Sequence, residues 1–282
     1  MPLPTLENPR VALRPLHQAN QLLSVIRFYL LPRDPNYIEW GTRVVAEGLS
    51  SDVLPGGSEI ILDFDDQVVV VRQPDSAQAA IPINGHSQRS LFGAILAELQ
   101  KSELAHVLSN DGDLVDQMIV ALAVKRPSIA NKHDDITDTA PLTVDPSAAQ
   151  AYNTVLYSIF TGIARFKASR VNGKTTPAVV WGEHFDLSTL IFAGSEATEK
   201  AAHINFGFAP YSTGIDFPYL YAYAYPMKPN LVPTLPDSAQ WHTEGWTGVV
   251  LPYTAIAAQD HPEQYIERMC DQIYTALLPL LA

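Results

Sequence analysis

The chain has 282 residues and a mass of 30.9 kDa, which is enough to bury a large core without disulfides or metal ions. Hydrophobic residues make up 47% of it, and this excludes bulk disorder. Eighteen Lys and Arg against 30 Asp and Glu give a net charge of −12. This charge argues against nucleic-acid partners and against docking on an anionic membrane.

The first part of the chain combines helices with strands. Apolar residues recur at helical spacing between Leu13 and Leu31, where Pro15 suits the first turn and Pro32 ends the helix. Clusters of β-branched residues between turn residues follow. The predicted elements are an extended segment at 37–46, a hairpin at 58–72 with its turn at Asp65-Asp66, a strand at 79–83 and a helix capped by Ser87.

Residues 127–145 are rich in proline and aspartate and are interpreted as a linker. Asp145 is expected to cap a long helix whose first residue is Pro146. Further elements are predicted beyond it: strands at 177–181, 187–192, 203–208, 218–225 and 247–251, and a closing helix that starts at Asp260.

These elements predict an α+β fold, with mostly antiparallel sheets flanked by helices. Both parts have the order helix, strands, helix, and the segment 44–49 resembles 179–185 with one residue inserted. This order fits either a chance recurrence of common elements or an internal duplication, and both interpretations stay open. The expected organisation is an N-terminal half at 1–126, the linker at 127–145 and a C-terminal half at 146–282, packed as one unit.

Several common chemistries lack their motifs. Gly173-Lys174-Thr175 resembles the end of a phosphate-binding loop, but Ala168 stands where that loop needs a glycine. The dinucleotide-binding, nucleophile-elbow and zinc-protease motifs are missing too, so we expect no tightly bound organic cofactor. The only cysteine, Cys270, is expected to be a packed side chain of the closing helix.

The single cysteine also bears on location, because it permits no intrachain disulfide. The first 13 residues lack the apolar segment of a signal peptide. No apolar run approaches the ~20 residues that cross a bilayer. We therefore expect a cytoplasmic protein.

The segment from Trp181 to Leu187 places three ionisable side chains in an apolar region. In a straight strand, Glu183 lies between the aromatic rings of Trp181 and Phe185, where desolvation suits a general acid or base. His184 and Asp186 then share the other face as an orienting pair or as metal ligands. The alternative is a hairpin turn whose charges lie in water.

Tyrosines alternate with small residues between Pro218 and Pro226. Strand geometry places Tyr219, Tyr221, Tyr223 and Tyr225 on one face and the small residues on the other. The tyrosine face fits either a ligand-binding wall or ordinary packing within a sheet.

Other candidate groups are weaker. His203 lies on a predicted strand, and with His184 and Asp186 it would complete a metal site. His133, Asp134, Asp135 and Asp138 form a second oxygen-rich cluster, which the linker makes more typical of solvated charge. The segment from Trp241 to Trp246 fits a lid or a partner contact.

A set of short motifs occurs in a fixed order along the chain. They are Gly48-Leu49-Ser50-Ser51, Gly173-Lys174-Thr175-Thr176-Pro177, Trp181-Gly182 with Phe185-Asp186-Leu187, Gly207-Phe208 with Pro210, Tyr221 to Pro226, and Leu251-Pro252-Tyr253. Together they resemble an uncharacterised family labelled domain of unknown function 5996, over about residues 16–281. The resemblance implies one architecture across both halves and supplies no activity, so no catalytic residue is carried over.

The leading interpretation is a protein that binds a small molecule in a pocket at the junction of its halves. If it is an enzyme, Glu183, His184 and Asp186 are the expected catalytic residues. The remaining candidates are ligand-binding residues, with Lys174 holding an anionic group: Lys174, Trp181, His203, Tyr219, Tyr221, Tyr223 and Tyr225. One alternative is a non-catalytic protein that contacts a protein partner or a second copy of itself as a homo-oligomer. The other alternative is a metal-dependent hydrolase.

Overall fold

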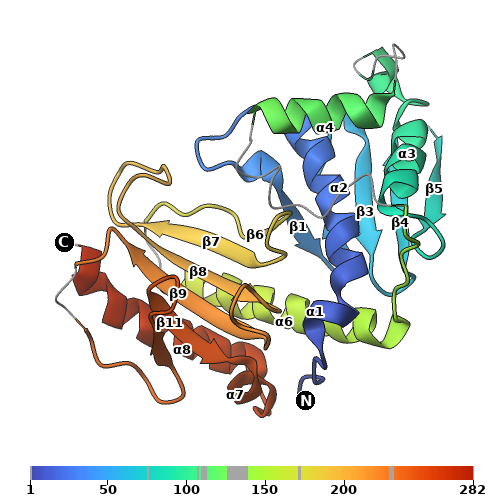
Figure 1. Cartoon of the computed structure of the whole chain (residues 1–282). Helices are drawn as coiled ribbons and strands as arrows, with labels where there is room; N and C mark the ends of the chain where they lie inside the picture. The colour runs from blue at the N-terminus through green and yellow to red at the C-terminus, as the bar shows by residue number, and fades with distance from the viewer. Residues whose placement is uncertain are drawn as a thin grey trace. The chain divides into compact units, whose positions relative to one another are not determined.

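The computed structural model describes residues 2–74, 76–106, 108, 113–125, 139–170, 173–228 and 232–281 (Figure 1). The chain forms two compact units. Unit 1 comprises Met1–Arg10, Thr154–Val179 and Asp186–Ala282, and unit 2 comprises Val11–Asn153 and Val180–Phe185. Residues 127–138 of the expected linker lie outside the described residues, and so does the cluster from His133 to Asp138.

Unit 2 contains an antiparallel sheet in the strand order β6-β1-β2-β3-β4-β5. The hairpin predicted at 58–72 is confirmed as β3 and β4, with its turn at the expected aspartates. The strands of this sheet are β1 (Gly41–Val45), β2 (Gly48–Ser50), β3 (Glu59–Asp63), β4 (Val68–Gln73), β5 (Ser76–Pro82) and the end of β6 (Val179–Trp181).

Helices α2 (Arg14–Leu30) and α3 (Gln88–Leu99) pack on this sheet (Figure 1). Ser87 caps α3 as predicted, because its side chain accepts a hydrogen bond from the backbone N–H of Ser90. Helix α4 (Leu114–Lys125) was not predicted from the sequence, and it contacts α2 and α3. The short 3₁₀ helices of the unit are η1 (Ile38–Trp40), η2 (Pro55–Gly57) and η3 (Glu103–His106), and α1 (Pro9–Ala12) precedes α2.

The strands of unit 1 are antiparallel and lie in the order β7-β8-β9-β11-β10. Four of these strands match predictions, and β10 is new. The strands are β7 (Leu187–Phe192), β8 (His203–Ala209), β9 (Tyr219–Tyr225), β10 (Gln240–His242) and β11 (Gly248–Pro252). Apolar side chains of β8 face the helices, as shown by Phe206, whose ring centroid lies 5.2 Å from that of Phe166.

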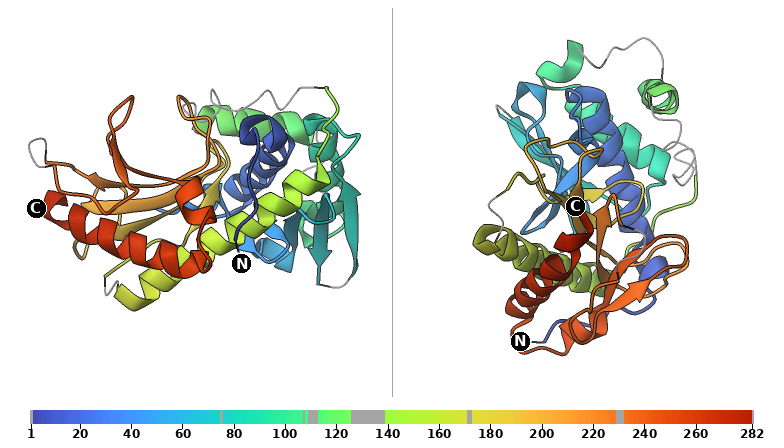
Figure 2. Two further views of the ribbon diagram at one scale, coloured as in Figure 1. Left: turned by 90° about the horizontal axis from the view of Figure 1, so that it is seen from below. Right: turned by 90° about the vertical axis from the view of Figure 1, so that its left-hand side faces the viewer.

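Helices α6 (Pro146–Arg170) and α8 (Pro262–Leu277) lie on one side of the unit 1 sheet (Figure 2, left). The predicted cap of α6 is confirmed, since Asp145 accepts a hydrogen bond from the backbone N–H of Ser147 at 2.8 Å. The first eight residues of α6 belong to unit 2. Between β11 and α8 lies the short α7 (Tyr253–Ala257), and η4 (Leu278–Leu281) follows α8.

Two local predictions were wrong. The segment 37–46 is not extended throughout, because Tyr37 has a left-handed backbone and residues 38–40 form η1 before the strand begins. The closing helix does not start at Asp260. It starts at Pro262 with His261 as its N-cap, since the fixed φ of proline suits the first helical position.

The fold thus combines helices with antiparallel strands, which confirms the α+β class predicted from the sequence. The structure by itself leaves the internal duplication a prediction. No helix in the described part of the chain combines the length and apolar character needed to span a membrane.

Candidate functional site

The tyrosine row of β9 lies on the face of the unit 1 sheet that points away from α6 and α8. The alternation is confirmed, because Leu220 pairs with Phe208 and shares its face, while Tyr221 pairs with Gly207. We call the face of the sheet that carries Tyr221 the tyrosine face. It carries Tyr219, Tyr221, Tyr223 and Tyr225 from β9, and His203 and Asn205 from β8.

Asp186 joins this face at the start of β7. Its Oδ2 accepts a hydrogen bond from the hydroxyl of Tyr221, although the side chain is only 9% exposed. Gly207 makes the contact possible, since a Cβ there would lie 2.5 Å from both the Tyr221 hydroxyl oxygen and the carbonyl oxygen of Leu187. The ring of Tyr221 therefore crosses β8 at the one position without a side chain and reaches the carboxylate.

Burial keeps these phenols protonated. It raises the pKa of Tyr221 well above 10, and the nearby charge of Asp186 raises it further. Burial also raises the pKa of Tyr223, whose hydroxyl accepts a hydrogen bond from Asn205 at 3.0 Å. The same cause raises the pKa of Tyr219, whose hydroxyl donates to Ser212 at 2.7 Å. These phenols therefore stay protonated at neutral pH, and their O–H groups can donate hydrogen bonds.

The side-chain oxygen of Asn205 is available as a hydrogen-bond acceptor. Its Nδ2 donates to Tyr223, while its Oδ1 is buried and has no hydrogen-bond partner within the described ranges. The face thus brings together a carboxylate, two phenols and an amide acceptor. Such a convergence of polar groups among aromatic rings is typical of ligand-binding sites.

Trp246 covers part of the tyrosine face. Its ring packs edge-on against Tyr221 and Tyr223, with centroids 6.0 and 6.5 Å apart, and lies 4.7 Å from the ring of His242. The predicted loop from Trp241 to Trp246 starts in β10 and then folds over the sheet. Tyr219 and Tyr221 are buried beneath such neighbours, whereas Tyr225 is 47% exposed at the outer end of the row.

His203 is buried at this outer end. Its ring stacks on Tyr225 with centroids 5.3 Å apart, and its Nδ1 lies 2.8 Å from the carbonyl oxygen of Ala201. Burial lowers the pKa of His203 below 6.5, against the opposing effects of that carbonyl and of Glu199.

The lowered pKa of His203 predicts a loss of stability in mild acid. The unfolded chain protonates the His203 imidazole more readily than the folded chain does. The contribution of His203 to the free energy of unfolding is therefore complete above pH 6.5 and declines as the pH falls through the pKa of the folded state. The urea midpoint should therefore fall less between pH 7.5 and 5.5 in His203→Phe, which keeps the ring, than in the wild type. Equal slopes in the two proteins would contradict this assignment.

Glu183, Trp181 and His184 lie in unit 2 instead. Residues 182–185 form a turn after β6, and the indole N–H of Trp40 donates to Oε2 of Glu183. His184 is exposed. The straight strand assumed for Glu183 does not form, because Phe185 adopts a left-handed backbone with φ of 56° and closes the turn. A bulky residue in this conformation is strained.

A polar stripe on α2 was not predicted from the sequence. It consists of the buried Asn20, Ser24 and Arg27 and the half-buried His17, which share a helix face at spacings of three and four residues. Nε2 of His17 lies 2.9 Å from the carbonyl oxygen of Gly182. Asn20 accepts a hydrogen bond from Thr42 at 2.7 Å. The spacing was present in the sequence, but it was hidden among the apolar residues of the same helix.

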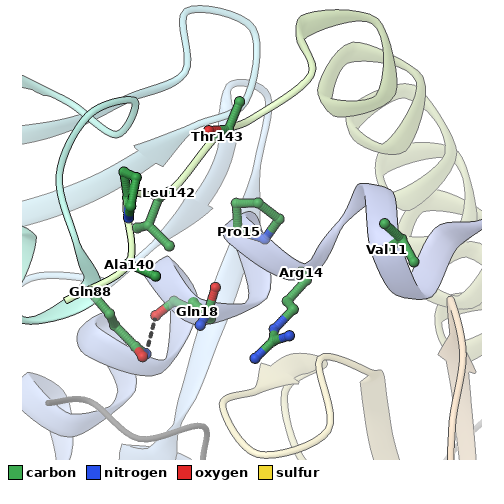
Figure 3. A pocket seen from close by; sticks show the side chains of 9 residues that line it. Val11, Arg14, Pro15, Gln18, Gln88, Ala140, Leu142 and Thr143 are labelled. Carbon is green, nitrogen blue, oxygen red and sulfur yellow. Dashed lines mark hydrogen bonds between the residues drawn. The ribbon is translucent and has the colours of Figure 1, made fainter. Parts of the chain in front are cut away.

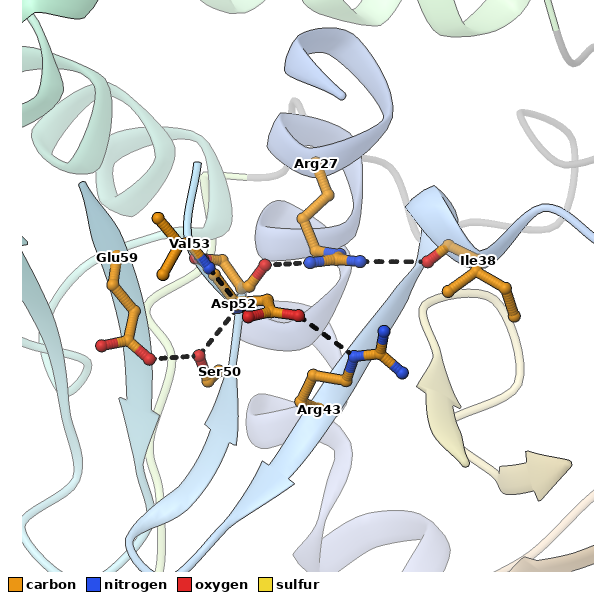
Figure 4. Close-up of polar contacts among 8 residues, drawn as sticks. Arg27, Ile38, Arg43, Ser50, Asp52, Val53 and Glu59 are labelled. Atoms are coloured by element: carbon orange, nitrogen blue, oxygen red, sulfur yellow. Dashed lines mark hydrogen bonds and ion pairs between the residues drawn. The ribbon is translucent and has the colours of Figure 1, made fainter. Parts of the chain in front are cut away.

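Arg27 is the charged member of this stripe (Figure 4). Its guanidinium donates to the carbonyl oxygens of Ser51 and Ile38, the latter at 3.0 Å. Burial lowers its pKa to about 10, and the neighbouring Arg43 lowers it as well. Arg27 thus remains charged at neutral pH and ties α2 to the segments after β2 and before β1.

The other candidates are placed as follows. Lys174 donates to the carbonyl oxygen of Ser195 at 2.7 Å and lies in unit 1. Among the described residues, no three His, Cys, Asp or Glu side chains form a group that could hold a metal ion. His184, Asp186 and His203 are all described and do not form such a group, so the structure does not support the metal site suggested by the sequence.

Comparison with known proteins identifies the family. The profile described as "family of unknown function (DUF5996)" matches residues 2–280, essentially the whole chain. The chain belongs to DUF5996. Membership in DUF5996 confirms the resemblance carried by the ordered motifs and extends it to both units. No curated protein and no solved structure matches the chain, so DUF5996 supplies no activity to compare with the tyrosine face.

Proposed function

We propose that this protein binds a small aromatic or hydroxylated molecule on the outer part of the tyrosine face. The observation that carries the proposal is the convergence of Asp186, Tyr221, Tyr223 and Asn205 on one face of one unit. The ligand would contact Tyr223, Tyr225 and Trp246, because Tyr221 and Tyr219 are already buried. Flat rings with polar edges suit such a ligand.

The Asp186–Tyr221 pair gives this face groups suited to acid–base chemistry. A phenol held protonated by burial can donate a hydrogen bond or proton to a developing negative charge. In the resting state the neighbouring carboxylate accepts a hydrogen bond from the phenol.

We propose Glu183 as a second candidate for a general acid or base. Its contact with Trp40 holds a carboxylate at a fixed place in unit 2, whereas Asp186 and the tyrosines of the main proposal belong to unit 1. Substitution of Glu183 by Gln tests this role, since unchanged ligand binding and unchanged activity would remove Glu183 from the candidates.

The main proposal is tested by thermal unfolding of the full chain with a panel of phenols and hydroxylated aromatic acids, including 4-hydroxybenzoate and 4-nitrophenol. We expect at least one compound to raise Tm by mass action, as any ligand of the folded state does. The rise should disappear in Tyr223→Leu.

The matched control is Tyr157→Leu, which removes an exposed tyrosine on α6 of the same unit. This variant should keep the full ligand-induced rise in Tm. A panel without any stabilising compound, or equal rises in Tyr223→Leu and the wild type, would remove the tyrosine face as a binding surface.

A non-catalytic, self-associating protein is the second candidate function. It is supported by the exposed rings of Phe217 and Tyr225 in unit 1, each more than 40% exposed. Exposed aromatic side chains are typical of interaction surfaces. A mass that rises with concentration in light scattering, and that returns to one subunit in Phe217→Ser, would favour this function over the first.

We also propose that the protein has no nucleic-acid or membrane partners, which its net charge of −12 supports. The buried Cys270, whose thiol pKa burial raises, supports a structural cysteine in a reducing compartment such as the cytoplasm. The succession of strand, turn and strand at both β1–β2 and β6–β7 supports an internal duplication.

A further inference from the structure

Unit 2 contains a pocket that plays no part in the tyrosine face. Its volume is about 290 Å³, and its walls come from the first turns of α2, the start of α3 and residues 140–143 (Figure 3). Ligand pockets generally measure ~300–1,000 Å³, so this one suits a molecule about the size of an amino acid.

Gln18 supplies a hydrogen-bonding group on the pocket wall. Its side chain is 6% exposed and lines the pocket from α2 (Figure 3). No hydrogen bond joins its side-chain amide to another residue in the described part of the chain. The end of this amide remains accessible to water in the pocket, and a ligand that offers both a donor and an acceptor can replace that water.

Gln88 holds Gln18 in place from the neighbouring helix. Its Nε2 donates to the backbone carbonyl of Gln18 at 2.9 Å and to Oε1 of Gln21 at 2.8 Å. Gln88 is 1% exposed and is the first residue of α3. The wall that carries the Gln18 amide is therefore fixed to two helices, which favours a preformed site.

Charge and polarity restrict the ligand further. Arg14 is the one charged residue among the nine that the structure shows lining the pocket, and it stands one helical turn before Gln18. Pro15 and Leu142 contribute apolar surface. A guanidinium favours a carboxylate and disfavours a cation, so the donor that pairs with Gln18 must be a neutral N–H.

We propose that this pocket binds a small carboxylate that carries an amide N–H and a short apolar group, as an N-acylated amino acid does. The amide N–H pairs with the Gln18 amide, the carboxylate faces Arg14, and the apolar group packs against Pro15 and Leu142. The site is separate from the tyrosine face and does not depend on the function proposed for it.

The test is isothermal titration of the full chain with N-acetyl-L-valine. We expect a Kd of about 1 mM or tighter, which a ligand of this size can reach. N-acetyl-N-methyl-L-valine lacks the amide N–H and should bind about tenfold more weakly or worse. N-acetyl-L-valine amide lacks the charge and should be weakened similarly.

Two variants locate the binding. Gln18→Met keeps the length of the side chain and removes its amide, so binding should weaken at least about tenfold while folding is retained. Ala140→Trp fills the pocket from an exposed position and should abolish binding. Gln78→Met is the matched control on β5, outside the pocket, and should bind as the wild type does.

No binding of N-acetyl-L-valine at 10 times the expected Kd would overturn the proposal. Binding that persists unchanged in both Gln18→Met and Ala140→Trp would also overturn it, because the ligand would then lie elsewhere. Equal affinity for the N-methylated compound would remove the amide pairing on which the ligand class rests.

Discussion

Arg27→Met is expected to lower the free energy of unfolding by about 3 kcal/mol. Arg27 is 2% exposed, and its guanidinium donates to two backbone carbonyls, those of Ser51 and Ile38. Methionine fills a similar volume but donates nothing. The carbonyl of Ser51 then loses its charged donor, and the buried Glu39 loses a nearby positive charge.

Urea unfolding followed by circular dichroism measures this change, with the slope m expected to stay constant. Arg27→Lys keeps the charge but cannot span both carbonyls, so we expect an intermediate loss of about 1–2 kcal/mol. The matched control is Arg33→Met, which removes an exposed arginine that stacks on Phe28 and should cost less than about 1 kcal/mol. An Arg27→Met midpoint equal to that of the wild type would show that the buried charge contributes no net stability.

The polar stripe that contains Arg27 could not be predicted from the sequence, although the helix that carries it could. The apolar periodicity of α2 predicts the helix correctly, because burial of Leu16, Leu22 and Leu23 follows from their spacing alone. The same periodicity says nothing about His17, Asn20 and Ser24, which are also covered. Their partners are backbone and side-chain groups far along the chain, and a single sequence does not reveal such pairs.

Length limits the prediction of strands in a similar way. β3 and β4 were predicted because each has a run of β-branched or apolar residues between turn residues. β2 and β10 have three residues each, which is too short to show an alternation. α4 is apolar around much of its circumference, and this obscured its helical period.

The tyrosine face was predictable in composition but not in its contacts. Alternation alone places the four tyrosines together, because the side-chain period of a strand is two. The pairing of Asp186 with Tyr221 depends on the register between β8 and β9, which tertiary packing sets. The one available signal was Gly207, a glycine inside a predicted strand, which is typical of a close approach by another group.

Gly207→Ala is expected to destabilise the protein by about 2–3 kcal/mol and to break the Asp186–Tyr221 hydrogen bond. The added Cβ would lie 2.5 Å from the Tyr221 hydroxyl oxygen and from the carbonyl oxygen of Leu187. The phenol ring is buried and cannot move freely, so either the ring or the strand must shift. In both cases Asp186 loses its phenolic donor.

Two comparisons separate this steric effect from a general cost of replacing glycine. Gly194→Ala, in the same unit, adds a Cβ with no atom within 4 Å and should change stability by less than about 0.5 kcal/mol. In a Tyr221→Ala background the ring is gone, so Gly207→Ala should cost clearly less than it does alone, which a double-mutant cycle measures. Additive costs in that cycle would show that the ring of Tyr221 does not rest on Gly207, and the geometry that presents Asp186 to this phenol would have to be abandoned.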